Sequence, residues 1–134
     1  MSLEKALSTA LSTVPECVAA GYVDMSSGML LGAKTTDSHP QEVLDLVAAA
    51  TADLFQGNNV TSIEKMFRKS RGVGEDGAHY FQEMIVFSDN LVHFFARAKK
   101  NGDQAAVFVC RKSVKIGMGL NKSRAAMVEI EAAV

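Results

Sequence analysis

The sequence predicts an α+β fold in which three helices flank a central, mostly antiparallel sheet of about five strands. Apolar residues recur at intervals of three and four in three segments, which is the spacing of one helical face. Between these segments lie short runs of β-branched and aromatic residues bounded by turn-forming residues, as expected of strands. The expected order is helix, two strands, helix, three strands, helix, and the length fits a single domain spanning residues 1–134.

The first quarter of the chain predicts a helix followed by a hairpin. Apolar residues at helical spacing run from Leu3 to Thr13, and Pro15 ends the helix. The segment from Cys17 to Met25 is apolar almost throughout, which indicates a strand in the middle of a sheet. Its predicted partner, Met29 to Ala33, follows across the turn Ser26-Ser27-Gly28.

A second helix is predicted from Glu42 to Phe55, with Ser38 as its N-cap and Gly57-Asn58-Asn59 after its end. Its apolar residues occupy two neighbouring faces, so the apolar surface is wider than one sheet contact requires. Part of that surface is expected to contact a second protein chain. The alternative is that the sheet and the other helices of the same chain cover all of it.

The second half of the chain predicts a meander and a closing helix. The expected strands are Tyr80 to Ser88, Leu91 to Ala98 and Gln104 to Arg111. A further polar strand is expected at an edge, from Thr61 to Lys69. The closing helix is expected within Met118 to Val134, with a late start capped by Asn121, because Gly119 disfavours helix.

Composition and motifs exclude several classes of function. The chain is 48% hydrophobic and 22% charged with a formal net charge of -1, which argues against a nucleic-acid surface. No apolar run is long enough to cross a membrane and no secretory signal begins the sequence, so a cytoplasmic protein without membrane insertion is expected. Cys17 and Cys110 are expected to be buried thiols rather than part of a disulfide framework or zinc site.

No motif predicts catalytic, cofactor-binding or metal-binding residues. The glycines from Gly72 to Gly77 match G-x-G-x-x-G, but a predicted strand rather than a helix follows them. His39, His79 and His93 lack local ligand spacing. The basic run "KMFRKSR", with Lys65, Arg68, Lys69 and Arg71, is interpreted as a solvated edge strand in preference to a patch for an anion or acidic partner.

The hairpin "GYVDMSSGMLLG", the alanine-rich helix after it, the meander and the closing "VCRKSVKIGMGLNKSRAAMVEIE" resemble the Roadblock family of dynein light chains and bacterial and archaeal regulators of small Ras-like GTPases. Asp24 to Gly28 and Gly117 occupy the places of the family's turn and of the glycine before its last helix. The stretch from Lys65 to Gly77 departs from the family pattern, because it is longer and more charged than the corresponding hairpin.

The resemblance implies a profilin-like layered fold and a homodimer whose sheets join edge to edge and whose second helices lie side by side. The candidate interface residues on the second helix are Leu44, Val47, Ala48, Thr51 and Phe55. The expected function is a non-enzymatic scaffold or regulator that binds a small Ras-like GTPase or a motor or signalling complex, with no cofactor. A small-molecule-binding sensory domain of similar layered fold is the alternative, based on the aromatic and methionine residues of the meander.

Overall fold

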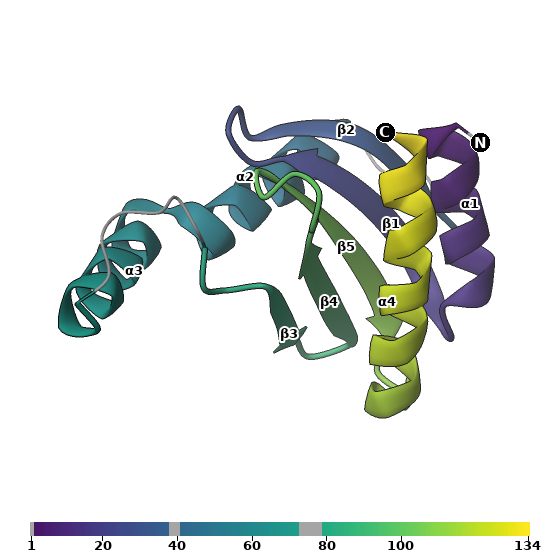
Figure 1. Ribbon diagram of the computed structural model, residues 1–134. Coiled ribbons are helices and arrows are strands. Elements are labelled where there is room, and N and C mark those ends of the chain that lie inside the picture. Colours follow the sequence, from purple (N-terminus) through teal and green to yellow (C-terminus); the bar gives the residue numbers. More distant parts are fainter. Residues whose placement is uncertain (1, 38–40, 73–78) are drawn as a thin grey trace.

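The computed structural model describes residues 2–37, 41–72 and 79–134, in which four helices and five strands form (Figure 1). The helices are α1 (Leu3–Thr13), α2 (Gln41–Gln56), α3 (Asn58–Ser70) and α4 (Ile116–Ala133). The strands are β1 (Cys17–Asp24), β2 (Met29–Thr35), β3 (Glu83–Phe87), β4 (Leu91–Arg97) and β5 (Gln104–Arg111). The predicted α+β class and the predicted antiparallel sheet are therefore confirmed.

All five strands form one antiparallel sheet in the order β2-β1-β5-β4-β3. The two hairpins, β1–β2 and β3–β4, lie at opposite sides, and β5 lies between them (Figure 1). The predicted hairpin turn places Gly28 at φ +74°, a conformation that glycine adopts without strain. β2 and β3 are the edge strands, so each has one side without a strand partner in the described chain.

One face of the sheet is covered by α1 and α4, which lie side by side with both chain ends close together (Figure 1). The helical spacing predicted for α1 aims Ala6, Leu7 and Ala10 at the sheet, and all three are buried. Alternate residues of the central strands face them. The largest fully buried side chains of this layer are Leu7, Tyr22, Phe94, Phe108 and Ile130.

The opposite face of the sheet is covered less completely, by α2, which packs against β1 and β2. Phe55 and Ala48 of α2 join Val23, Phe95 and Val107 in a second, smaller core. The rings of Phe55 and Phe95 meet edge to face, with centroids 6.3 Å apart. The main core therefore lies beneath α1 and α4, and only a thin one lies beneath α2.

The prediction of a strand from Thr61 to Lys69 is wrong, because this segment lies in helix α3. Gly57 ends α2 and serves as the N-cap of α3, so the Gly57-Asn58-Asn59 sequence is a bend between two helices. A Cβ on residue 57 would lie 2.7 Å from the carbonyl oxygen of Asp53, which only glycine avoids. The described chain thus has a fourth helix in addition to the three that were predicted.

The predicted late start of the last helix is also wrong. Helix α4 begins at Ile116 with Lys115 as its N-cap, and Asn121 lies inside it. Gly119 is present for packing: a Cβ there would lie 2.6 Å from Cζ of Phe94. The glycine lets α4 approach β4 closely, so it does not mark a helix boundary.

Three features of the sequence lie outside the described residues, at least in part: Ser38 as an N-cap, His39, and most of the Gly72 to Gly77 pattern. Within the residues that the structure describes, no helix has the length and apolar character needed to span a membrane. Among the same residues, no cluster of His, Cys, Asp and Glu side chains could hold a metal ion.

Candidate interaction surface

Helix α2 presents one side to the sheet and the other to solvent. Of the predicted interface residues, Ala48, Thr51 and Phe55 are buried against their own chain. Leu44 is half-buried and Val47 is 41% exposed. The structure therefore divides the predicted set: three side chains hold α2 on the sheet, and two lie at the border of the exposed side.

The solvent side of α2 carries large apolar residues that nothing in the described chain covers. Leu46 is 70% exposed, and Leu54, about two turns further on, is 41% exposed. Val47 lies beside Leu46. We call these three residues the α2 stripe. Sequence reasoning missed Leu46 because apolar residues surround most of the helix, so the helical period alone does not show which side faces the sheet.

The space between α2 and the sheet is not fully filled. An apolar cavity of about 170 Å³ lies between Leu44 and Val47 of α2 and small residues of the sheet. The sheet contributes mainly short side chains at this point, including Ala19, Gly21 and Ala33. The cavity borders the α2 stripe through Val47, so an unfilled apolar space adjoins an exposed apolar surface.

Strand β3 provides a second unpartnered feature. Its inner side pairs with β4 throughout, from Glu83↔Ala96 to Phe87↔Val92, and its outer edge pairs with no strand of the described chain. Val86 is 38% exposed and Phe87 is 65% exposed. An edge strand with exposed apolar side chains is a template for pairing with another chain.

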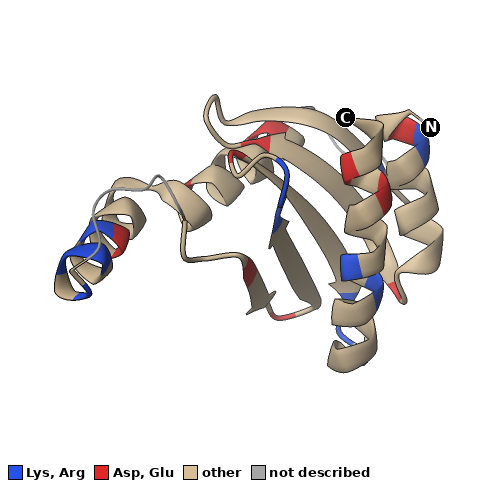
Figure 2. Cartoon of the chain, viewed as in Figure 1, with Lys and Arg blue, Asp and Glu red and all other residues tan. Residues whose placement is uncertain are grey.

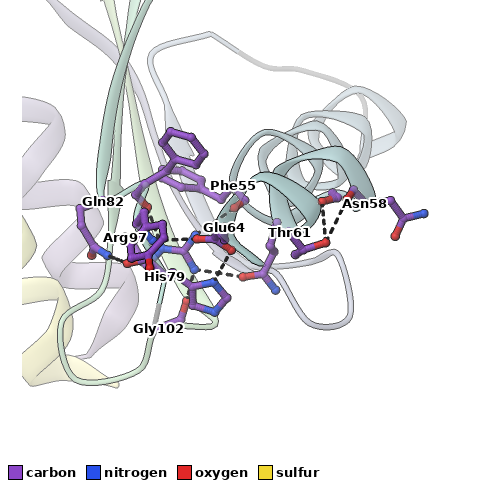
Figure 3. A network of polar contacts seen from close by, with 12 residues as sticks. Phe55, Asn58, Thr61, Glu64, His79, Gln82, Arg97 and Gly102 are labelled. Atoms are coloured by element: carbon purple, nitrogen blue, oxygen red, sulfur yellow. Dashed lines mark hydrogen bonds and ion pairs between the residues drawn. The ribbon is translucent and has the colours of Figure 1, made fainter. Parts of the chain in front are cut away.

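A buried arginine fixes the end of α2 to the sheet (Figure 3). Arg97 of β4 is 4% exposed and donates hydrogen bonds to the carbonyl oxygens of Phe55, Phe81 and Gly102 at 3.0, 2.9 and 2.6 Å. It also donates to Oε1 of Gln56 at 3.0 Å. Burial lowers the pKa of the Arg97 guanidinium. One side chain thereby joins α2, the segment before β3 and the β4–β5 turn.

A buried glutamate attaches α3 to the same region (Figure 3). Glu64 is 1% exposed; it accepts a hydrogen bond from the backbone amide of Tyr80 at 2.7 Å and lies 3.2 Å from Nδ1 of His79. Arg68, one turn further along α3, lies over the Tyr80 ring, 5.5 Å from its centroid. The buried face of α3 therefore carries charged residues, which reverses the usual pattern of an amphipathic helix.

The opposite face of α3 is apolar and its flanks are basic. Ile63, Met66 and Phe67 are 40%, 69% and 48% exposed. Exposed Lys65 and Lys69 lie on the helix and exposed Arg71 is its C-cap, so blue dominates this projecting helix in Figure 2. Of the basic run interpreted from the sequence, Arg68 is buried and the other three residues are exposed.

The described residues contain no constellation typical of a catalytic site. His93 stacks on Phe95 and lies 3.4 Å from the Ser88 hydroxyl, and burial lowers its pKa. These contacts place the Ser88 hydroxyl beside the ring but no carboxylate, so the pair lacks the acid that completes a Ser-His-Asp triad. The described residues offer three surfaces for contact with other molecules: the α2 stripe, the β3 edge and the exposed face of α3.

Solved structures share this arrangement of elements. A Roadblock/LC7 domain from Streptomyces avermitilis superimposes with a TM-score of 0.68 at 14% identity, covering 98% of this chain and 97% of that one. The chain has the Roadblock/LC7 fold. A structure of MglB with a tetrameric arrangement also has a TM-score of 0.68, at 18% identity, covering 97% of this chain and 88% of that one.

The Roadblock/LC7 fold is profilin-like, as expected. Profilin II of Acanthamoeba castellanii superimposes with a TM-score of 0.60 at 12% identity, covering 99% of this chain and all of that one. No family model matches the sequence, and no curated protein matches it. The likeness to known proteins therefore lies in the fold, which the short turn and strand motifs of the sequence indicated.

Proposed function

We propose that this Roadblock-fold chain is a cytoplasmic, non-enzymatic homodimer that binds and regulates a small Ras-like GTPase. The observation that carries the proposal is the α2 stripe, in which Leu46, Val47 and Leu54 are 70%, 41% and 41% exposed. Burying large apolar side chains of this kind contributes roughly 1.5 to 3 kcal/mol each, before the cost of association. A second copy of the chain that binds through its own α2 stripe would bury these side chains on both chains.

The proposed dimer is two-fold symmetric, because such an interface matches the same patch on both chains. The α2 helices lie side by side, and each β3 edge pairs with the β3 edge of the other copy. Leu46, Val47 and Leu54 make the contact, with Leu44 at its border. Ala48, Thr51 and Phe55 contribute from beneath, by holding α2 at the correct height above the sheet.

Two further lines support a regulatory assembly. The sequence motifs resemble a family that includes regulators of Ras-like GTPases, and a protein of the same fold, MglB, has been solved in a tetrameric arrangement. The dimer would present a continuous platform with two symmetry-related patches for the GTPase.

The dimer is tested by introducing charge into the α2 stripe. Leu46→Glu combined with Leu54→Glu should convert the protein to a monomer in sedimentation-velocity experiments, because two-fold symmetry places four carboxylates in one apolar contact. Val128→Glu on α4 is the matched control, since Val128 is 70% exposed, as Leu46 is, but lies on the other side of the sheet. A wild-type monomer, or a dimer unaffected by the double substitution, would refute the proposal.

The partner is tested with the intact dimer. Purified Ras-like GTPases from the source organism, loaded with GDP or a non-hydrolysable GTP analogue, should bind with a preference for one nucleotide state and change their rate of hydrolysis or exchange. The Leu46→Glu, Leu54→Glu monomer should lose this effect while Val128→Glu keeps it. If the dimer binds the GTPases in neither nucleotide state, the proposed partner is refuted and the dimer must bind a different type of partner.

The apolar cavity beneath α2 favours a second candidate, a sensor of a small apolar molecule. Its volume of about 170 Å³ is small beside the roughly 300 to 1,000 Å³ of typical ligand pockets. A retained ligand in the native mass spectrum, together with a ligand-induced rise in melting temperature, would support the sensor. A bare dimer supports the interaction module.

A further inference from the structure

The two cysteines of the chain are far apart in sequence but directly opposite in the sheet. Cys17 of β1 pairs with Cys110 of β5 in the register of the two strands. Opposite residues of antiparallel strands point to the same face, and both side chains belong to the core beneath α1 and α4. The expectation of buried thiols is therefore confirmed, with an addition that the sequence did not reveal: the thiols face each other.

The pairing is of the kind in which side chains come closest. The amide of Arg111 donates to the carbonyl of Glu16 at 2.9 Å, while the amide of Cys17 donates to Val14 rather than to β5. The bond from Arg111 to Glu16 lies just outside the Cys17–Cys110 pair, as it does beside a non-hydrogen-bonded pair, and the strand register shifts on the other side, between Cys17 and Ala19. Non-hydrogen-bonded pairs separate Cα atoms by about 4.5 Å, which lies within the roughly 4.4 to 6.8 Å that a disulfide spans.

We propose that Cys17 and Cys110 form an oxidation site, at which a small hydroperoxide converts the dithiol to an intrachain disulfide between β1 and β5. Cys17 would react first. It lies at the start of β1 and is 7% exposed, whereas Cys110 is 0% exposed. Interaction with the Cys110 side chain lowers the pKa of Cys17, and the same interaction, together with burial, raises the pKa of Cys110.

The reaction balances in two steps. The Cys17 thiolate attacks one peroxide oxygen, the O–O bond breaks, and Cys17 becomes a sulfenic acid as hydroxide or alkoxide leaves. The Cys110 sulfur then attacks the Cys17 sulfur and displaces the hydroxyl group, which leaves as water with the Cys110 proton. Two thiols are oxidised, one peroxide is reduced, and two hydrogen atoms leave the protein.

The disulfide would close a loop of 93 residues, counted as 110 minus 17, that contains α2, α3, strands β1 to β4 and all but the last residue of β5. Cross-links across long loops restrict the unfolded chain most. The oxidised protein should therefore melt on the order of 10 °C above the reduced protein.

The test uses the wild-type protein, reduced and then treated with hydrogen peroxide at low molar excess. A non-reducing digest should join the Cys17 peptide to the Cys110 peptide, with two free thiols before treatment, none after, and two again after dithiothreitol. The digest decides the question because seven methionines can also take up oxygen and obscure the intact mass. Melting curves of both forms should show the expected rise.

Single-cysteine variants test the order of the steps. In Cys110→Ser, Cys17 should stop at a sulfenic acid that dimedone traps; in Cys17→Ser, Cys110 should not react. Two thiols that stay free in the treated wild type, a sulfenic acid that persists there, or a disulfide between two chains would each overturn the proposal. Dimedone labelling of Cys110 rather than Cys17 would overturn the assignment of the reacting thiol.

Discussion

The guanidinium of Arg97 lies over the ring of Phe55, 5.1 Å from the ring centroid, and donates a hydrogen bond to the carbonyl oxygen of the same residue at 3.0 Å. The last turn of α2 is thus held from its backbone and its side chain together. Because α2 carries the α2 stripe, the position of the proposed dimer contact depends on this one arginine of β4.

Arg97→Met should destabilise the fold by about 3 kcal/mol or more, since it leaves the buried carbonyl oxygen of Phe55 and the partly buried ones of Phe81 and Gly102 without their charged donor. Denaturant unfolding followed by circular dichroism measures the loss. Arg124→Met is the control: Arg124 pairs with Glu83 at an exposed position, where solvent screens the pair and its contribution to stability is small. Equal effects of the two substitutions would contradict the role given to Arg97.

Glu64→Ala should release α3, because it removes the acceptor of the Tyr80 amide and the contact with His79 while the rest of α3 is largely exposed. Limited trypsin digestion should then cut the basic α3 segment much faster than in the wild type. The global melting temperature should fall less than it does for Arg97→Met. Lys65→Ala, at an exposed neighbouring position, should leave α3 as protected as in the wild type.

Gly119→Ala should cost about 1 to 3 kcal/mol, because the new methyl group overlaps Phe94, whose ring is only 2% exposed and has no free space. Gly117→Ala is matched to it in chemistry and lies two residues away on the same helix. No atom lies within 4 Å of a Cβ at residue 117, so this change should be neutral or stabilise by up to about 1 kcal/mol. Similar effects of the two variants on stability would contradict the close-packing role given to Gly119.

His93 should make the fold less stable at acid pH. Burial lowers its folded-state pKa below the unfolded value of 6.5, so the unfolded chain binds the proton more readily. The contribution of the neutral His93 ring to folding stability is complete above the unfolded-state pKa and is lost as pH falls through the folded-state pKa. The difference in stability between wild type and His93→Gln should therefore shift in favour of His93→Gln between pH 7.5 and pH 5.5, as measured by urea unfolding; a constant difference would contradict this assignment.

The paired carboxylate at Glu83 acts in a lower pH range. Hydrogen bonding to Arg124 lowers the pKa of Glu83 below 4.5, so its contribution is present above that value and lost as pH falls further. The pH range in which Glu83 changes folding stability therefore lies below the range in which His93 does. A fall in stability between pH 7.5 and 5.5 that persists in His93→Gln would point to other groups.

Local sequence signals were sufficient where the pattern and the packing agreed. The residues of α1 recur at helical spacing and their apolar side is the buried one, so its bounds are as predicted from Leu3 to Thr13. The β1–β2 hairpin follows equally well from its apolar run and its turn. Strand β5 also has its predicted bounds, Gln104–Arg111.

Helix α3 was missed because its packing contradicts the usual pattern. Its apolar residues Ile63 and Met66 face solvent, and Phe67 is half exposed with its ring beside that of Tyr80. The charged residues Glu64 and Arg68 face inward. The spacing of Glu64 and Arg68 is helical, but two charged residues at i and i+4 are ordinarily a sign of an exposed face. Only contacts from distant residues, His79 and Tyr80, reveal their role.

The candidate interaction surface was only partly predictable for a related reason. The sequence showed that α2 carries more apolar surface than one sheet contact needs, but it did not show which side is covered. The covered side depends on Arg97 and Phe95 of a strand some forty residues later, which fix the rotation of the helix through Phe55. Similarly, the sequence predicted that Gly119 disfavours helix, because the close approach of Phe94 that requires a glycine there is a tertiary contact.

The central place of β5 bears on how the chain is made. β5 is the last of the five described strands in chain order, it lies between the two hairpins that precede it, and in the sheet the two hairpins do not pair with each other directly. Nascent chains shorter than residue 111 therefore hold two separate hairpins with their inner strands, β1 and β4, unpaired along one side. The five-stranded sheet therefore cannot form before β5 has been made, and until then the free sides of β1 and β4 are able to pair with other chains.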